Sequence, residues 1–217
     1  MTGNSHIGYM PLEDMGTRMR EVMHRCAWEG TPRPGSLAIR VHSAGAFWAF
    51  ADSLQASFRD GVCDHAIKDL CGVYISRTVK CEFCGNQRST KATTAGLVET
   101  QYDELLNFEA SDKYDVCQKA ALAYAEAIAW GLNSEDLWRR LHRSFSEEEL
   151  VELGCFIALT FGQQSWIRLL GIDHNEYMPG SDASMAPGFE SADAASASKA
   201  SPDYWAETNA GGIPSRQ

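Results

Sequence analysis

The chain has 217 residues, 44% of them hydrophobic, and a formal net charge of −10. This composition is typical of a globular protein with a core, and the acidic balance argues against nucleic acid as a partner. The N-terminal segment Met1–Met10 lacks a cationic region followed by an apolar run, and no apolar stretch reaches about 18 residues. We therefore expect no signal peptide and no membrane span.

Helical periodicity dominates the first half of the chain. A helix is predicted over Leu12–Glu29, and the turn-forming sequence Thr31–Gly35 ends it. Ser43 and Asp64 are each placed to cap a further helix, because their side chains accept hydrogen bonds from the free N–H groups of a first turn. The only candidate for a strand is the short apolar segment Ser36–Val41.

The middle of the chain is also predicted to be helical. After Cys81–Cys84 the chain is expected to re-enter helix through Gly96, and a short helix follows near Gln101–Phe108. The alanine-rich segment Tyr114–Trp130 has strong helix propensity. The fold class predicted from these elements is an all-α bundle.

The last predicted helix has the clearest start signal. Ser146–Glu149 has the sequence of a capping box, and the helix is predicted to run to about Leu170 and to stop at Gly171. Its middle, Cys155–Phe161, is apolar on all sides, so we expect a central, buried helix. Residues 1–180 are thus predicted to form one helical domain.

Residues 181–217 are rich in Ala, Ser, Asp, Gly and Pro, which is the composition of a tail or arm. Tyr204, Trp205 and Ile213 depart from it and could dock the tail on the body or on a neighbouring subunit. A disordered tail is the alternative.

Seven cysteines occur, at positions 26, 63, 71, 81, 84, 117 and 155. The odd number argues against a secreted disulfide framework and favours a reducing, cytoplasmic compartment. A free cysteine usually behaves as a small buried hydrophobe, so Cys26, Cys117 and Cys155 are expected in the core.

Cys81 and Cys84 are the candidate reactive pair. Two thiols three residues apart on one helical turn can close a disulfide, and a helix N-terminus stabilises a thiolate. Lys80 lies beside them, and Arg88 would follow on the same helical face, so that both would lower the thiol pKa values. The pattern predicts a redox cycle in which one thiol is oxidised and the other resolves it. Asp69 would be the proton-handling carboxylate if folding brings it near.

Two alternatives weigh against this interpretation. Zinc usually takes four ligands, and the chain has neither a second CxxC nor a closely spaced His pair, although Cys63, His65 and Cys71 could be recruited. We therefore expect no metal. A lone Asp69 is more often a solvated helix charge than a proton relay.

The motifs together resemble the alkylhydroperoxidase/carboxymuconolactone decarboxylase family over about residues 9–173. The matching segments are Lys68–Leu70, Cys81–Cys84, Ala95–Leu97, Ala121–Glu126, Phe145–Leu150 and Leu170–Ile172. The resemblance implies an all-α bundle that assembles into homo-oligomers, trimers or hexamers. It also implies a thiol-dependent peroxidase without a cofactor, in which Cys84 is the peroxidatic thiol and Cys81 the resolving one. Its partners would be a small-molecule substrate and a dithiol electron donor.

The chain departs from the family's peroxidase pattern at three positions. It has Asp69 in place of Glu, Phe83 in place of the His between the cysteines, and Arg88 in place of a second His. Arginine stays protonated and cannot act as a general base near neutral pH, but it can hold a thiolate or a carboxylate. Two further hypotheses therefore stay open. One is a cofactor-independent decarboxylase, lyase or isomerase in which Arg88 grips a small carboxylic acid, and the other is a non-catalytic oligomeric binding protein.

Overall fold

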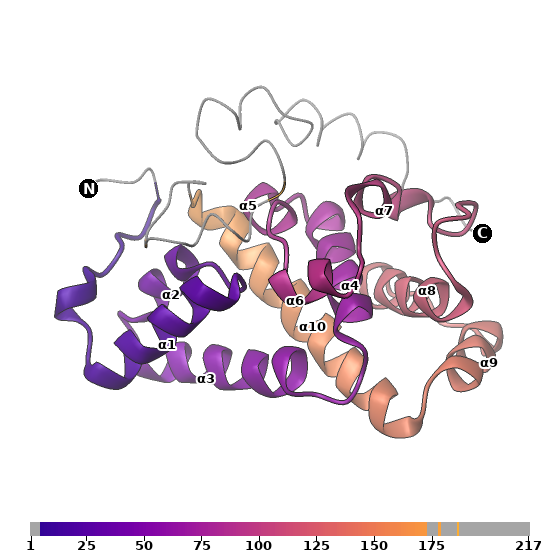
Figure 1. Ribbon diagram of the computed structural model, residues 1–217, viewed down its shortest axis with the longest axis horizontal. Coiled ribbons are helices and arrows are strands. Elements are labelled where there is room, and N and C mark those ends of the chain that lie inside the picture. The colour runs from indigo at the N-terminus through magenta and orange to yellow at the C-terminus, as the bar shows by residue number, and fades with distance from the viewer. Residues whose placement is uncertain (1–4, 173–177, 179–185, 187–217) are drawn as a thin grey trace.

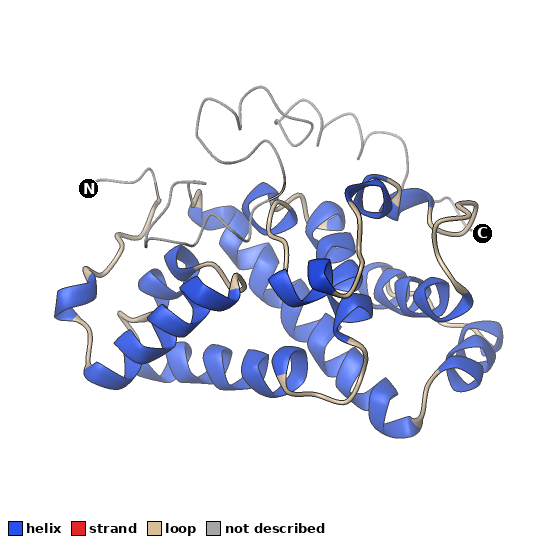
Figure 2. Cartoon of the chain, in the orientation of Figure 1, coloured by secondary structure: helices blue, strands red, loops and turns tan. Residues whose placement is uncertain are grey.

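The computed structural model describes residues 5–172, 178 and 186. Within this part of the chain the ordered elements are helices and no strand is formed, which confirms the predicted all-α class (Figure 2). The helices are η1 Leu12–Asp14, α1 Thr17–Glu29, α2 Pro34–Arg40, α3 Ala44–Leu54, the π-helical turn η2 Gln55–Arg59, α4 His65–Thr78, α5 Glu82–Gly85, α6 Thr90–Thr94, α7 Glu99–Asp103, η3 Leu105–Asn107, α8 Val116–Trp130, α9 Glu135–Ser144 and α10 Glu147–Leu170.

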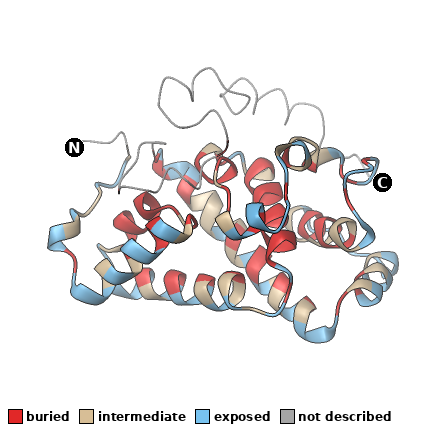
Figure 3. Cartoon of the chain, in the orientation of Figure 1, coloured by how far each residue is buried: buried red, intermediate tan, exposed pale blue. Residues whose placement is uncertain are grey.

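Helices α4, α8 and α10 form the centre of the bundle, with α10 running diagonally across it (Figure 1). Helix α4 is buried along almost its whole length and packs against both α8 and α10 (Figure 3). Helices α1, α2 and α3 pack against one another in chain order, and α9 packs on α8. The segment with the two cysteines, α5 and its N-cap residue Cys81, contacts both α4 and α10, so the thiols lie beside these two central helices.

The predicted caps are present. Ser43 Oγ accepts from the Ala46 amide at 3.4 Å, and Asp64 Oδ1 accepts from the Ala66 amide at 2.8 Å. Ser146 and Glu149 satisfy each other's amides in the predicted capping box. These contacts use N–H groups that have no partner inside the helix, so they fix where α3, α4 and α10 begin.

The candidate strand at Ser36–Val41 does not form. The segment belongs to helix α2, which is buried along its whole length. Pro34 occupies the start of this helix, where its fixed φ suits the first turn and its missing N–H costs nothing. A helix of 7 residues buried on all sides shows no amphipathic period, so its apolar run is indistinguishable from that of a buried strand.

The helix expected through Gly96 is also wrong, because the chain forms two short helices, α5 and α6, with a connection between them. Ser89 caps α6 and has an extended backbone, which interrupts the helix. Arg88 therefore lies in the connection and does not share a helical face with the cysteines.

Helix α10 is central but not buried all round. Phe156 and Ile157 are buried, whereas Cys155 is exposed, so the expectation of a core position for Cys155 is wrong. Cys26 is buried as expected, and Cys117 is half-buried.

The predicted tail over residues 181–217 lies mostly outside the described residues, as do Tyr204, Trp205 and Ile213. Met178 and Ala186 are described and buried, and the Ala186 amide donates to the Asn86 carbonyl at 2.8 Å. The domain boundary near residue 180 therefore stays a prediction. None of the helices in the described ranges is both long and apolar enough to cross a membrane.

Candidate functional site

Cys81 and Cys84 lie together at the start of α5. The Cys81 amide donates to the Ser76 carbonyl at the end of α4 (2.9 Å), and the Cys81 carbonyl accepts from the Gly85 amide (2.9 Å). Burial raises the pKa of Cys84, and the adjacent Cys81 thiol, which interacts with it, raises it further. Their exposed fractions are only 1% and 6%. The pair is thus close enough for disulfide chemistry but hidden from bulk solvent.

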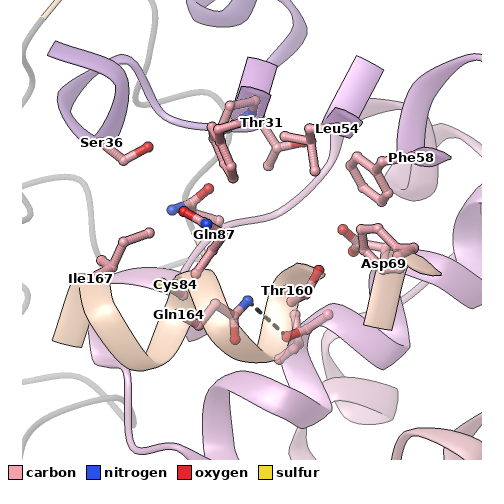
Figure 4. A pocket seen from close by; sticks show the side chains of 16 residues that line it. Thr31, Ser36, Leu54, Phe58, Asp69, Cys84, Gln87, Thr160, Gln164 and Ile167 are labelled. Carbon is pink, nitrogen blue, oxygen red and sulfur yellow. Dashed lines mark hydrogen bonds between the residues drawn. The ribbon is translucent and has the colours of Figure 1, made fainter. Parts of the chain in front are cut away.

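Cys84 opens onto a cavity of about 90 Å³, and Asp69 lines the same cavity (Figure 4). The figure shows Cys84 beside Gln87 and Asp69 beside Phe58, at different places on the wall. Cys81 does not line the cavity and packs behind Cys84 in an apolar cluster with α10. Most of the wall is apolar and is formed by Phe50, Leu54, Phe58, Val73, Phe156 and Ile167.

Asp69 is a buried carboxylate with a fixed orientation. Tyr102 donates its hydroxyl to Asp69 Oδ2 at 2.5 Å, and the Ser89 amide also donates to this carboxylate. Burial raises the pKa of Asp69 to about 6, although these hydrogen bonds and the charge of Arg88 lower it. The solvated-charge alternative is therefore wrong, and Asp69 can exchange a proton near neutral pH inside the cavity.

Arg88 takes part in holding Asp69 rather than in activating the thiols. Its guanidinium forms a bidentate pair with Glu99 at 2.9 and 3.0 Å and lies over the Tyr102 ring, 4.1 Å from its centroid. Arg88 does not line the cavity. The expectation that Arg88 and Lys80 lower the thiol pKa is wrong, since Arg88 is paired elsewhere and Lys80 is exposed.

The cation whose charge acts on Cys84 is Arg40, at the end of α2. Burial raises the pKa of Cys84 well above its ordinary value, the neighbouring Cys81 raises it further, and Arg40 lowers it. Burial lowers the pKa of Arg40 to about 10, so the guanidinium is still charged at neutral pH. The thiol of Cys84 is therefore protonated at rest, contrary to the expectation of a thiolate at an open helix terminus.

Seven polar side chains also line the cavity, and one of them has no hydrogen-bond partner among the described residues. Thr31 Oγ1 is buried and makes no hydrogen bond among the described residues. Gln163 Oε1 accepts from Arg40, and Gln164 donates to the Gly72 carbonyl at 3.1 Å. A buried hydroxyl without a partner is costly, so Thr31 offers a hydrogen bond to a bound molecule.

The structure thus brings Cys84, Cys81 and Asp69 to one site and places Arg88 behind Asp69. Sequence reasoning missed Arg40, Tyr102 and Thr31. A signal existed for Arg40, because a single charge stands within the apolar run Leu37–Val41. In the described ranges, no group of three or more His, Cys, Asp or Glu side chains is placed to hold a metal ion.

No protein-family model matches the chain. Two proteins of Mycobacterium tuberculosis, the uncharacterized proteins MT2376 and Rv2313c, are each 39% identical to it over 75 residues. The match covers 34% of this chain and 26% of either relative, so the chain matches only about a quarter of their length.

Two solved structures have the same fold. One is a cysteine-to-alanine variant of the debrominase Bmp8 in complex with 2,3,4-tribromopyrrole, with a TM-score of 0.68 and 17% identity over 82% of this chain and 95% of that chain. The other is the apo debrominase Bmp8, with a TM-score of 0.63 and 18% identity over 77% of this chain and 89% of that chain. At this identity the likeness shows the fold alone.

Proposed function

We propose that the protein is a thiol-dependent enzyme of the alkylhydroperoxidase-like class, which reduces a small molecule with the Cys84–Cys81 pair. The observation that carries the proposal is that Cys84 and Asp69 line one cavity while Cys81 is hydrogen-bonded to Cys84 from behind. This arrangement supplies a nucleophile, a proton donor and a second thiol within one site.

With a hydroperoxide the steps balance as follows. The Cys84 thiol gives its proton to the Asp69 carboxylate, the thiolate attacks the terminal oxygen, the O–O bond breaks, and the leaving alkoxide takes the proton from Asp69. Cys84 is then a sulfenic acid. The Cys81 thiol attacks the Cys84 sulfur, and water leaves as the disulfide forms. The two thiols have then lost the two electrons that reduced the hydroperoxide. A dithiol donor, such as a dihydrolipoamide-type molecule, restores both thiols by exchange.

The second candidate is reductive dehalogenation by the same pair. The aromatic wall formed by Phe50, Phe58 and Phe156 suits a single flat ring, and a protein of this fold is a debrominase whose variant binds a bromopyrrole. In this reaction a C–Br bond is replaced by a C–H bond, bromide leaves, and the two thiols become a disulfide. Thr31 Oγ1 would accept from, or donate to, a polar group on the ring.

The lyase hypothesis loses its motivation. It relied on Arg88 to bind a substrate carboxylate, but Arg88 is paired with Glu99 and lies outside the cavity wall. We propose further that the enzyme works in a reducing compartment and as a homo-oligomer, as its resemblance implies.

The test is substrate-driven oxidation followed by peptide mass spectrometry. The reduced protein is treated with cumene hydroperoxide or with 2,3,4-tribromopyrrole, and bromide release is measured in the second case. We expect a Cys81–Cys84 disulfide with at least one of the two. Cys81→Ser should stop at a dimedone-reactive Cys84, and Cys84→Ser should not react.

Cys71→Ser is the matched control, because Cys71 is equally buried but lies outside the cavity. It should form the disulfide at the wild-type rate. If neither substrate oxidises the pair faster than it oxidises Cys71, the thiol enzyme is rejected and a non-catalytic binding protein becomes the better interpretation.

A further inference from the structure

Arg40 is a buried cation without a carboxylate. Its exposed fraction is 2%, and no Asp or Glu side chain contacts it within the described part of the chain. Among the other buried basic side chains, Lys68 is paired with Glu152 and Arg88 with Glu99. A buried charge normally needs a counter-charge, so the burial of Arg40 without a carboxylate partner requires an explanation.

The guanidinium is fixed by neutral groups that belong to the wall of the cavity. Its nitrogens donate to the Ser36 carbonyl and to Gln163 Oε1, the latter at 2.7 Å. It lies over the rings of Phe50 and Trp166, 3.9 and 4.9 Å from their centroids. Ser36, Gln163 and Phe50 all line the cavity that Cys84 lines. Arg40 is therefore held in one orientation immediately behind the wall.

Helix α2 also brings Arg40 to the cysteines. Ile39, the preceding residue, packs with Cys81 and Cys84 in one apolar cluster, and Trp166 packs on the same cluster. A negative charge on Cys84 raises the pKa of Arg40. In turn, the charge of Arg40 lowers the pKa of Cys84, whereas Cys81 raises it. Arg40 therefore lies behind the wall of the cavity that Cys84 lines, close enough for the charges of the two groups to interact.

We propose that Arg40 is a positioning residue whose charge stabilises the thiolate of Cys84, so that the two form an ion pair only when the thiol loses its proton. This inference rests on the proposed function, in which Cys84 is the nucleophile. Arg40 would then take over the role that a histidine has in the family's peroxidase pattern. At rest the thiol is protected from oxidants, and the cation favours its ionisation during reaction.

The experiment measures the rate at which neutral iodoacetamide alkylates Cys84, by peptide mass spectrometry between pH 7 and 9. Arg40→Gln removes the charge, and Arg40→Met keeps the packing of the stem between the two rings. We expect either change to slow alkylation of Cys84 about tenfold at a fixed pH, because one unit of thiol pKa is a tenfold change in thiolate. Arg40→Lys should stay closer to wild type.

Arg59→Gln is the matched control, because Arg59 is a partly buried arginine whose charge acts on Cys26 instead. It should leave the Cys84 rate unchanged. The inference is overturned if the neutral Arg40 variants fold and keep the wild-type profile, or if Arg40→Lys is as slow as Arg40→Gln.

A measurement on the wild type covers the case in which the variants do not fold. The ratio of alkylation by anionic iodoacetate to alkylation by iodoacetamide, a reagent of nearly the same size, should be higher at Cys84 than at the exposed Cys155. An equal or lower ratio at Cys84 contradicts a nearby cation. None of these readouts uses a substrate, so their failure is separable from the failure of the proposed function.

Discussion

The hydroxyl of Tyr102 tunes Asp69, the proton-handling group of the cavity. Because the O–H at 2.5 Å stabilises the carboxylate, its loss in Tyr102→Phe is expected to raise the pKa of Asp69 above about 6, by roughly one unit. Because the proposed mechanism uses the Asp69 carboxylate to take the thiol proton before returning it as the proton donor, the limb of the pH profile on which disulfide formation slows as resting Asp69 becomes protonated should move to higher pH by that amount. Tyr114→Phe is the control, since Tyr114 bonds to the Gln101 carbonyl instead. Identical profiles for both variants would contradict a role for Tyr102.

Asp69 and His65 have shifted pKa values that affect stability in opposite directions. His65 is buried and neutral, because its Nδ1 donates to the Phe58 carbonyl while Nε2 accepts from the Ser89 hydroxyl at 2.6 Å. Burial lowers the pKa of His65 to about 4, whereas burial raises that of Asp69 to about 6. As the pH falls from 7 to 4, His65 is protonated at higher pH in the unfolded chain than in the folded one, which lowers the stability of the fold. Asp69 is protonated at higher pH in the folded chain than in the unfolded one, which raises it. The two effects nearly cancel.

The cancellation can be removed with one substitution. In Asp69→Asn only the His65 effect remains, so the free energy of unfolding should fall by about 2 to 3 kcal/mol more than in wild type between pH 7 and pH 4. Urea denaturation at both pH values measures this, and comparing the slopes cancels any constant cost of the substitution. His65→Gln should show the opposite trend. Parallel curves for wild type and Asp69→Asn would contradict the assigned pKa shifts.

At the scale of the elements, the turn before α4 is fixed by a carboxylate from α10. Glu152 accepts from the Val62 and Cys63 amides at 2.6 and 3.0 Å and pairs with buried Lys68 at 2.7 Å. A Cβ on Gly61 would overlap this carboxylate. The glycine is needed here because the two elements approach so closely.

Gly61→Ala is therefore expected to lower the free energy of unfolding by about 1 to 3 kcal/mol, since it displaces Glu152 from the amides and from Lys68. Gly45→Ala is the matched control, because Gly45 lies in α3 with open space around its Cα. That change should stabilise by about 0.5 to 1 kcal/mol through helix propensity. Chemical denaturation of both variants gives the comparison, and equal signs would contradict it.

The elements also show how far sequence reasoning reaches. Caps at Ser43, Asp64 and Ser146 and the glycine stop at Gly171 depend on neighbours within four residues, so they were predictable. The helix α2 was not, because its burial depends on contacts with α1 and α3 that leave no period in its own sequence. The break between α5 and α6 could not be predicted either, because it depends on the packing of both short helices on α4.

At the scale of the whole molecule, the candidate site combines α2, α4, α5, α7 and α10. Cys81, Cys84 and Asp69 could be proposed from the sequence, because the residue types and their spacing imply thiol chemistry. Tyr102 hydrogen-bonds Asp69, and the charge of Arg40 acts on Cys84. Each of these interactions joins residues 33 or more positions apart, so only the tertiary fold determines it.

The assembly expected from the family resemblance is a prediction about the whole molecule. Several large apolar side chains are exposed on a single copy, among them Trp28 at 88%. Light scattering on the reduced protein should give a molar mass of a trimer or a hexamer of the 23.9 kDa chain. A monomer mass at micromolar concentration would contradict the expectation.

The exposed position of Cys155 on the outer side of α10 has a practical consequence for all of these measurements. Any thiol reagent in bulk solution meets this sulfur before it meets the two in the cavity, so a total thiol count follows the wrong cysteine. Excess oxidant can also link two copies through it, and such a covalent dimer would imitate natural association on a sizing column. A Cys155→Ser background removes both artefacts and leaves the cavity untouched.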